Sequence, residues 1–316
     1  MNVVALAGGV GGAKLAHGLA LILPTDQLTV IVNTGDDFTH LGMRICPDLD
    51  TVCYTLAGLA NPLTGWGRDG ESWRVMENLS RLGGPGWFNL GDQDLATHLE
   101  RTRRLNDGAR LSEVTRAFCR AWGIGPEVLP MSDEPVSTWV ETSDAGSLPF
   151  QDYFVRLQCA PVVTGFVFRD VEKAAPAPGV LAAIQRADVV VICPSNPWVS
   201  IGPIMSISAI REKIEEKFVV AVSPIVGGKA IKGPAAKMYA ELGIEPSALA
   251  VADQYRSFIN GFVYDQVDEA QASMINALGM QTLVTDTVMK TVDDRRRLAD
   301  EILLFCKQCV GGKSRL

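Results

Sequence analysis

The sequence lacks three features that would each point to a particular class of protein. No apolar run reaches the roughly 18 residues that a membrane-spanning helix needs, and the N-terminus lacks the basic segment of a signal peptide. Histidine occurs only three times, without an H-x-x-H or H-E pattern, which argues against a zinc site. The formal charge of −7 argues against a nucleic-acid surface, which would need a basic face. We therefore expect a cytoplasmic protein that acts on small molecules.

Cysteine is present, but its pattern does not suit a disulfide framework. The seven cysteines are odd in number and scattered, which favours reduced thiols. Residues 306–309 have the sequence C-K-Q-C, but no second pair completes a tetrahedral zinc site. With 47% hydrophobic and 21% charged residues, the chain has the composition of an ordinary soluble globular protein.

Short apolar runs that alternate with helical patterns predict an α/β fold. Residues 187–193 (A-D-V-V-V-I-C) have the near-continuous apolar character of a central parallel strand buried on both faces. We expect residues 1–316 to form a single α/β domain with a Rossmann-like, doubly wound, mainly parallel sheet. Its strands are predicted at 2–7, 28–32, 187–193, 217–222, 261–265 and 281–284.

Residues 60–178 interrupt this alternation and are predicted to form an inserted subdomain of helices and a small β element. Its helices are expected at 72–82, 95–105 and 111–122, and its strands at 136–140, 150–157 and 162–168. The proline-rich residues 174–179 mark its end. At the other end of the chain, residues 311–315 are expected to be a disordered tail.

A glycine-rich turn follows the first predicted strand and precedes a helix expected at 15–23. Residues 8–14 have the sequence G-G-V-G-G-A-K. Bare backbone N–H groups and a helix N-terminus suit phosphate, and ligands of parallel sheets gather at the carboxyl ends of strands. The sequence is neither Walker A nor a clean G-x-G-x-x-G, so a tight turn that only packs helix against strand is the alternative.

An acidic stretch, residues 33–50, follows the second predicted strand and precedes a predicted helix. It carries four carboxylates, Asp36, Asp37, Asp48 and Asp50. Concentrating this negative charge in one loop costs free energy unless a cation or a donor-rich ligand offsets it. For any single aspartate, a turn or N-cap role is an equal alternative, whereas the set favours a metal or polyol site.

Polar loops also follow two later strands of the predicted sheet. Residues 194–197 (P-S-N-P) follow one strand, and residues 223–234 follow the next. These proline-stiffened loops are expected at the same edge of the sheet as the glycine turn. Glycine and lysine suit phosphates, and paired aspartates suit Mg²⁺ or a sugar-like hydroxyl. Phosphoryl transfer from a nucleotide-linked donor to an alcohol follows as the reaction class.

Eight motifs in order resemble the 2-phospho-L-lactate transferase family of coenzyme F-420 biosynthesis (LPPG:Fo 2-phospho-L-lactate transferase or phosphoenolpyruvate transferase). The resemblance runs from the first strand to about residue 300. A shared turn preference does not account for eight ordered motifs. They are G-G-V-G-G-A-K at 8–14, N-T-G-D-D at 33–37, P-D-L-D-T-V at 47–52, L-G-D-Q-D-L-A-T-H at 90–98, M-S-D-E-P-V-S-T at 131–138, P-S-N-P at 194–197, S-I-G-P-I at 200–204 and S-P-I-V-G-G at 223–228.

The resemblance implies a Mg²⁺-dependent transfer to the deazaflavin alcohol Fo. The terminal ribityl hydroxyl of Fo would attack the phosphorus that bears a lactyl or enolpyruvyl group in a guanosine diphosphate-linked donor, and GMP would leave. As a hypothesis, Asp50 orients or deprotonates that hydroxyl, because it lies nearest the following helix and need not be consumed by the metal. A homodimer is the default expectation for such an enzyme.

Site residues are carried over from the family by motif. Asp50 and Asn89 would contact Fo, and Asp37 and Asp48 would bind the metal. The residues expected to meet the donor and its phosphates are Gly8, Gly9, Gly11, Gly12, Lys14, Ser195, Asn196, Ser223, Gly227 and Gly228.

Two other functions remain open. A related group with a similar glycine loop, the gluconeogenesis-factor group, consists of regulatory proteins that bind nucleotide-sugars; residues 47–52 and 131–137 resemble the transferase instead. A nucleotide-sugar or NAD-binding oxidoreductase ranks last, because the acidic residue expected about 20 positions past the glycine loop has no clean counterpart at a strand end.

Overall fold

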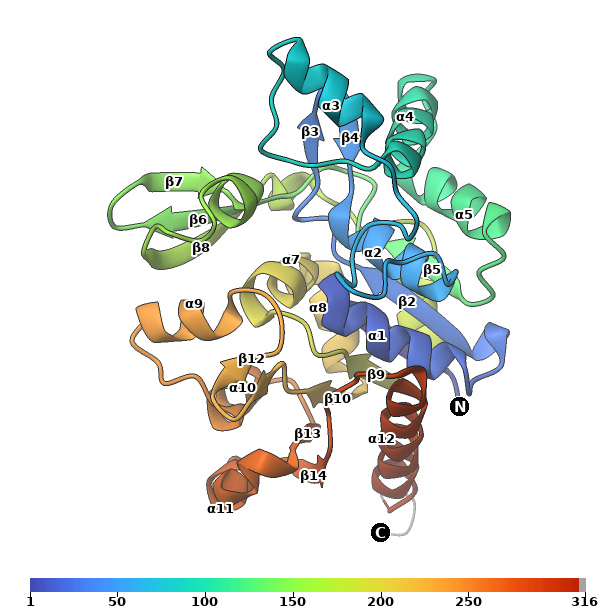
Figure 1. The fold of residues 1–316 in the computed structure, drawn as a ribbon. Helices are drawn as coiled ribbons and strands as arrows, with labels where there is room; N and C mark the ends of the chain where they lie inside the picture. The colour runs from blue at the N-terminus through green and yellow to red at the C-terminus, as the bar shows by residue number, and fades with distance from the viewer. Residues whose placement is uncertain (313–316) are drawn as a thin grey trace.

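The computed structural model describes residues 1–312, and a seven-stranded sheet lies at its centre (Figure 1). Every neighbouring pair of its strands is parallel. The spatial order is β14 (Gln281–Thr285), β13 (Gly261–Asp265), β10 (Phe218–Val222), β9 (Val189–Ile192), β1 (Val3–Ala7), β2 (Leu28–Val32) and β5 (Glu127–Pro130).

The chain winds this sheet in two directions from β1. It adds β2 and β5 on one side, then returns to place β9 on the other side of β1 and continues through β10, β13 and β14. Val3 of β1 is paired with Leu28 of β2 and with Val189 of β9. The point between β1 and β9, where the winding reverses, is where doubly wound sheets open a ligand crevice. The predicted Rossmann-like fold class is confirmed.

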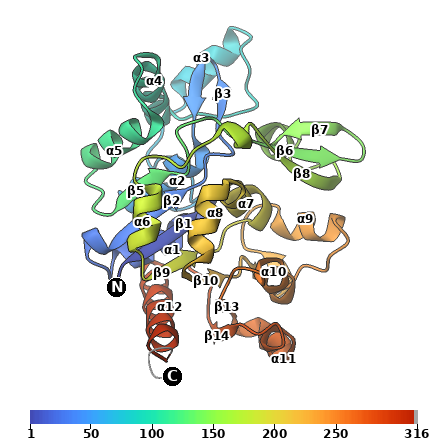
Figure 2. The ribbon, with the colours of Figure 1, turned by 180° about the vertical axis from the view of Figure 1, so that it is seen from behind.

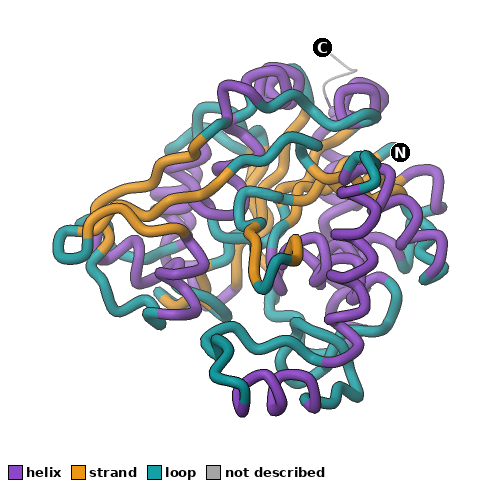
Figure 3. Tube along the Cα trace, turned by 90° about the horizontal axis from the view of Figure 1, so that it is seen from above, coloured by secondary structure: helices purple, strands orange, loops and turns teal. Residues whose placement is uncertain are grey.

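Helices cover both faces of the sheet (Figures 1 and 2), and from above they lie on both sides of the strands (Figure 3). Residues that alternate along β1 enter two separate cores, Val4 and Leu6 on one face and Ala5 and Ala7 on the other. One face is covered by α1 (Gly9–Ala20), α2 (Pro47–Leu56), α5 (Leu111–Ala121) and α12 (Val292–Gly312), and the other by α6 (Val180–Arg186), α8 (Ser208–Glu215), α10 (Ala248–Tyr255) and α11 (Ala272–Asn276).

Smaller elements project from the sheet and surround the carboxyl ends of its strands (Figure 1). Two of them are antiparallel hairpins, and three strands form a separate antiparallel sheet in the order β7-β6-β8. These elements are β3 (Phe38–His40), β4 (Met43–Ile45), α3 (Arg74–Arg81), α4 (Asp92–Asn106), β6 (Ser137–Thr142), β7 (Gly146–Pro149), β8 (Val163–Arg169), α7 (Gly202–Ser206), β11 (Ile225–Val226), β12 (Lys229–Ala230) and α9 (Ala235–Glu241).

The structure differs from the sequence-based expectations in four places. The predicted insertion contains a strand of the central sheet, β5, which is short and ends in Pro130. Residues 152–156, expected in a strand, form a π-helical turn. The acidic stretch is not one loop, because it holds the β3–β4 hairpin and the start of α2 at Pro47, a favoured first helical residue. The expected tail begins later, because α12 extends to Gly312; residues 313–315 lie outside the described part of the chain.

Within residues 1–312, no helix is both long and apolar enough to cross a membrane. All seven cysteines are free, as predicted, and six of them are buried.

Candidate active site

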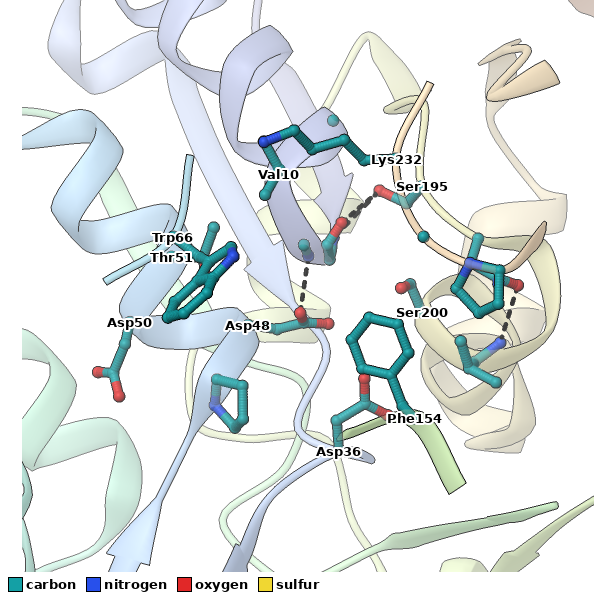
Figure 4. A pocket seen from close by; sticks show the side chains of 18 of the residues that line it. Val10, Asp36, Asp48, Asp50, Thr51, Trp66, Phe154, Ser195, Ser200 and Lys232 are labelled. Carbon is teal, nitrogen blue, oxygen red and sulfur yellow. Dashed lines mark hydrogen bonds between the residues drawn. The ribbon is translucent and has the colours of Figure 1, made fainter. Parts of the chain in front are cut away.

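A cavity of about 630 Å³ opens at the carboxyl ends of β1, β9 and β10, at the reversal point of the sheet (Figure 4). The glycine turn after β1, the loops after β9 and β10, the first turns of α2 and the segments before and within α4 all contribute to its wall. Sequence segments that lie almost 200 residues apart therefore meet around one space.

The glycine turn forms the N-terminus of α1, with Gly8 as the N-cap. Gly8, Gly9 and Gly11 line the cavity, and no carboxylate follows within the first turn of α1. A Cβ atom on Gly11 would overlap the carbonyl oxygen of Pro194, so the turn packs closely against the loop after β9. Gly12 faces Ala7 and Ser195 instead of the cavity, which makes it a packing residue.

Asp48 occupies the anion position at the start of α1. The N–H of Gly9 donates to its Oδ1 at 2.7 Å (Figure 4), and Nδ2 of Asn33 donates to its Oδ2 at 2.9 Å. The positive end of a helix dipole favours a negative group at this point. Even so, burial raises the pKa of Asp48 from 3.8 to about 6.

Two further carboxylates lie close to Asp48 and are equally buried. Burial, and then the charges of Asp48 and Asp37, raise the pKa of Asp36 well above its usual value. Burial also raises the pKa of Asp37 to about 6, although Arg44 lies 3.4 Å away and opposes this shift. The Oδ1 atoms of Asp36 and Asp37 have no hydrogen-bond partner among residues 1–312.

These orphaned oxygens and raised pKa values fit a bound cation, and carboxylate oxygens are ligands that Mg²⁺ prefers. Asp36 and Asp48 line the cavity, whereas Asp37 faces Arg44 and does not. The structure thus places one predicted metal ligand, Asp48, at the cavity and adds Asp36 beside it. The assignment of Asp37 stays a prediction.

Asp50 also lines the cavity, but its carboxylate turns towards α4. Nη1 of Arg101 donates to its Oδ2 at 3.1 Å, and Nη2 of Arg101 donates to its Oδ1. Asp50, Asp94 and His98 offer ligand atoms within 4.8 Å of one another, a second grouping that could hold a metal. The Arg101 guanidinium already supplies a positive charge there. Asn89, the other predicted Fo contact, lines the same cavity.

The loops after β9 and β10 hold the predicted donor-side residues in different ways. Oγ of Ser195 donates to the carbonyl oxygen of Gly8 at 2.9 Å and faces the cavity. Asn196 caps the helical turn that follows it, with Oδ1 accepting from the N–H of Trp198 at 3.0 Å. Ser223 lines the cavity, whereas Gly227 and Gly228 form the turn of the β11–β12 hairpin outside it.

Lys14 reaches the cavity wall from the second turn of α1. Its Nζ donates to the carbonyl oxygen of Met289 at 2.7 Å. Burial, followed by the nearby charges of Arg295 and Lys232, lowers its pKa. Lys232 lines the cavity as well, so two lysines lie near the glycine turn where an anionic ligand would offset their repulsion.

Aromatic residues also line the cavity, and the sequence-based interpretation missed them. The rings of Phe150 and Phe154 are stacked with centroids 5.3 Å apart, and Phe154 points into the cavity beside Asp36 (Figure 4). Their i,i+4 spacing was the available signal, because it pairs side chains on a helix but not on the strand that we expected there. The other aromatic residues that line the cavity are Tyr54, Trp66, Trp87 and Phe88.

A cavity at the reversal point of a Rossmann-like sheet, with a glycine turn, lysines and buried aspartates on its wall, is typical of transferases that act on phosphorylated nucleotides. A family model described as 2-phospho-L-lactate transferase CofD matches residues 3–299. The chain belongs to this family of transferases, as its motifs indicated.

Similar proteins occur in Streptomyces and Methanosarcina species. A phosphoenolpyruvate transferase of Streptomyces griseus is 45% identical over 98% of this chain and 99% of its own length. A 2-phospho-L-lactate transferase of Methanosarcina acetivorans is 40% identical over 97% of this chain and all of its own length. The fold is also similar to that of a UPF0052-family protein from Bacillus halodurans, with a TM-score of 0.64, 18% identity and coverage of 96% of this chain and 99% of that one.

Proposed function

We propose that this protein transfers a phospho-lactyl or phosphoenolpyruvyl group from a guanosine diphosphate-linked donor to the ribityl hydroxyl of Fo, as a step of coenzyme F-420 biosynthesis. The hydroxyl oxygen forms a bond to the phosphorus that bears the three-carbon acid. The bond from that phosphorus to the bridging oxygen breaks, GMP leaves with this oxygen, and the hydroxyl proton passes to solvent.

The observation that carries this proposal is that two kinds of group line the cavity. The first kind comprises glycine backbone, lysines and buried aspartates, and the second comprises six aromatic rings. A diphosphate suits the first kind, because helix N-termini and lysines attract anions. A planar, uncharged ring system suits the second, because aromatic rings stack on one another. Fo combines such a ring with a flexible polyol arm that can reach the charged groups.

Within this arrangement each part of the chain has a separate task. The first turn of α1, Ser195 and Lys14 hold the donor phosphates beside Asp48, which accepts from the N–H of Gly9. Asp50 and Asn89 bind the ribityl end of Fo. Phe154 and the rings near it bind the deazaflavin. Bound Fo and the aromatic rings around it would displace water from the cavity, so that the ribityl hydroxyl is the nucleophile nearest the phosphorus.

Asp48 and Asp36 are the residues that would hold Mg²⁺. When bound there, the ion would lower the cost of the charge on the phosphoryl oxygens. Asp37, one residue further along the chain, is the third candidate, and its Oδ1 atom has no partner among the described residues. Asn33 keeps Asp48 in place through the hydrogen bond to Oδ2.

The test is to incubate the purified protein with Mg²⁺, Fo and each donor in turn, following GMP release and the mass of the product. We expect one product per turnover, heavier than Fo by the transferred group, and the faster donor identifies the three-carbon acid as lactyl, enolpyruvyl or glyceryl. No product with any donor, together with tight binding of a nucleotide-sugar, would favour a regulatory protein of the gluconeogenesis-factor group instead. Light scattering of the same preparation tests the expected homodimer, and cell fractionation tests the cytoplasmic location.

A further inference from the structure

We infer that Arg101 is a positioning residue, which fixes the Asp50 carboxylate so that its free lone pairs face the acceptor hydroxyl. The inference rests on the proposed function, because it deepens the role of Asp50 at the acceptor end of the cavity. Arg101 itself does not line the cavity, so it would act only through Asp50.

The contact between the two side chains is bidentate. Nη1 of Arg101 donates to Oδ2 of Asp50 at 3.1 Å while Nη2 donates to Oδ1. Two parallel hydrogen bonds fix the plane of a carboxylate, which a single point charge such as a lysine ammonium does not do. A carboxylate offers about four lone-pair positions. Arg101 occupies two of these positions and leaves two free. Because Asp50 lines the cavity, the two free positions are available to a hydroxyl bound there.

Arg101 is buried and makes further contacts beyond those with Asp50. It is only 3% exposed, and its Nη1 also donates to the carbonyl oxygen of Arg44 at 3.3 Å. The same atom lies 3.2 Å from Nδ1 of His98.

The residues around His98 include one from α2, the helix that carries Asp50. Nε2 of His98 lies 3.5 Å from Oδ1 of Asp94, and this oxygen accepts a hydrogen bond of 2.6 Å from the hydroxyl of Tyr54. Tyr54 lies one turn after Asp50 on α2. Nε2 of His98 has no hydrogen-bond partner among the described residues, so these side chains restrict Arg101 by direct contact and packing and not by a continuous chain of hydrogen bonds.

Arg101 is also the charged partner of Asp50. The ion pairs of Asp50 among residues 1–312 involve Arg101 and, at 3.6 Å, the imidazole of His98. Arg101 is the permanently charged member of this pair, because a guanidinium is not deprotonated in proteins. No substitution that removes the guanidinium can leave Asp50 both charged and aligned.

The experiment compares Arg101→Ala and Arg101→Lys with wild type in steady-state transfer to Fo. A matched control is Arg104→Ala, because Arg104 lies one turn away on α4 and also packs over the Phe118 ring, at 5.7 Å against 5.8 Å for Arg101, but pairs with Glu100 at the surface. Misplacement of a reacting group by 1 Å can cost about 100-fold. We expect Arg101→Ala to lower kcat/KM for Fo by that order while the KM for the donor changes by less than about twofold. Arg104→Ala should match wild type.

Chemical rescue with guanidinium ion distinguishes a positioning role of Arg101 from a structural one. Guanidinium ion at tens of millimolar, compared with equal potassium, should restore part of the activity of Arg101→Ala but none of Asp50→Asn, because only the first variant lacks the guanidinium. Arg101→Lys keeps the charge without the bidentate geometry, so its kcat/KM for Fo should lie between wild type and Arg101→Ala. If Arg101→Ala does not fold, the lysine variant carries the test.

Equal kcat/KM values for Fo in wild type and Arg101→Lys, or a donor KM that rises by as large a factor as kcat/KM for Fo falls, would overturn the inference while the proposed function stands. A wild-type protein that transfers no group to Fo with any donor would remove the proposed function, and the inference with it. Binding of Fo to wild type, measured by the fluorescence of the deazaflavin, distinguishes a missing acceptor site from a slow chemical step.

Discussion

Replacing Asp48 with asparagine is expected to stabilise the metal-free protein at pH 8 and to have almost no effect at pH 5. Burial raises the pKa of Asp48 from 3.8 to about 6, so the folded protein binds this proton more tightly than the unfolded chain. The corresponding stability is complete below pH 3.8 and is lost as the pH rises through about 6. At pH 8 the folded protein therefore carries the full cost of a buried, ionised Asp48.

The size of the effect follows from the shift. The pKa rises by 6 − 3.8, or about 2.2 units, which corresponds to about 3 kcal/mol at 1.36 kcal/mol per unit. Asparagine still accepts from Gly9, but its amide faces the amide of Asn33, a mismatch that costs about 1–2 kcal/mol. The net gain at pH 8 is about 1–2 kcal/mol, which raises the Tm by about 2–3 °C in a chain of this length. At pH 5 the free energy of unfolding of wild type is about 1.4 kcal/mol higher than at pH 8, because Asp48 is then largely protonated in the folded protein. The advantage of Asp48→Asn over wild type therefore disappears.

Thermal unfolding of both proteins in chelator, at pH 5, 6, 7 and 8, measures this dependence. Asp26→Asn makes the same charge change at an exposed position and is the control for net charge. Added Mg²⁺ should raise the Tm of wild type at pH 8 more than that of Asp48→Asn. A difference between Asp48→Asn and wild type that is the same at every pH would refute the argument, because it would mean that Asp48 does not titrate in the predicted range.

Three further substitutions test separate walls of the cavity. Gly11→Ala should lower the free energy of unfolding by about 1–3 kcal/mol, because its Cβ would overlap the Pro194 carbonyl. Gly86→Ala is the control, because its Cβ would meet open space and stability should not change. Chemical denaturation measures both variants. Phe154→Ala should raise the KM for Fo by about tenfold and leave the donor KM unchanged, and equal increases would remove this ring from the acceptor site. Asp50→Asn should lower turnover by about two orders of magnitude with unchanged circular dichroism, and near-normal turnover would exclude Asp50 as base or orienting group.

The central strands could be predicted because burial leaves a local mark on the sequence. Strands covered on both faces need apolar residues at every position, as in Val189–Ile192, so a continuous run is enough to locate them. The edge strand β5 has only four residues, begins with an exposed glutamate and ends in proline, so it resembles a loop. Its place in the sheet depends on pairing with β2, almost 100 residues earlier. No local pattern encodes such a distant pair.

The charged and the aromatic residues of the cavity also differ in how far a local sequence pattern predicts them. Phosphate and metal sites use glycine turns and adjacent carboxylates, which are short motifs, and Gly8, Gly9, Gly11, Asp48 and Asp50 all reach the cavity wall. The aromatic lining comes from four separate segments, around residues 54, 66, 87 and 150–154, and none of these rings belongs to a motif. Arg101 is a similar case, because its contact with Asp50 spans 51 residues.

The separate tasks proposed for Asp48 and Asp50 follow from the start of α2. The sequence showed two aspartates in what we took to be one loop, where nothing distinguishes their directions. Because α2 begins at Pro47, both lie in its first turn, and a spacing of two residues at about 100° each turns their side chains to nearly opposite sides of the helix. Asp48 therefore meets the glycine turn of α1, and Asp50 meets Arg101 on α4. The two substitutions should accordingly have different effects. Asp48→Asn should change the dependence of activity on Mg²⁺ concentration, and Asp50→Asn should change the turnover of Fo.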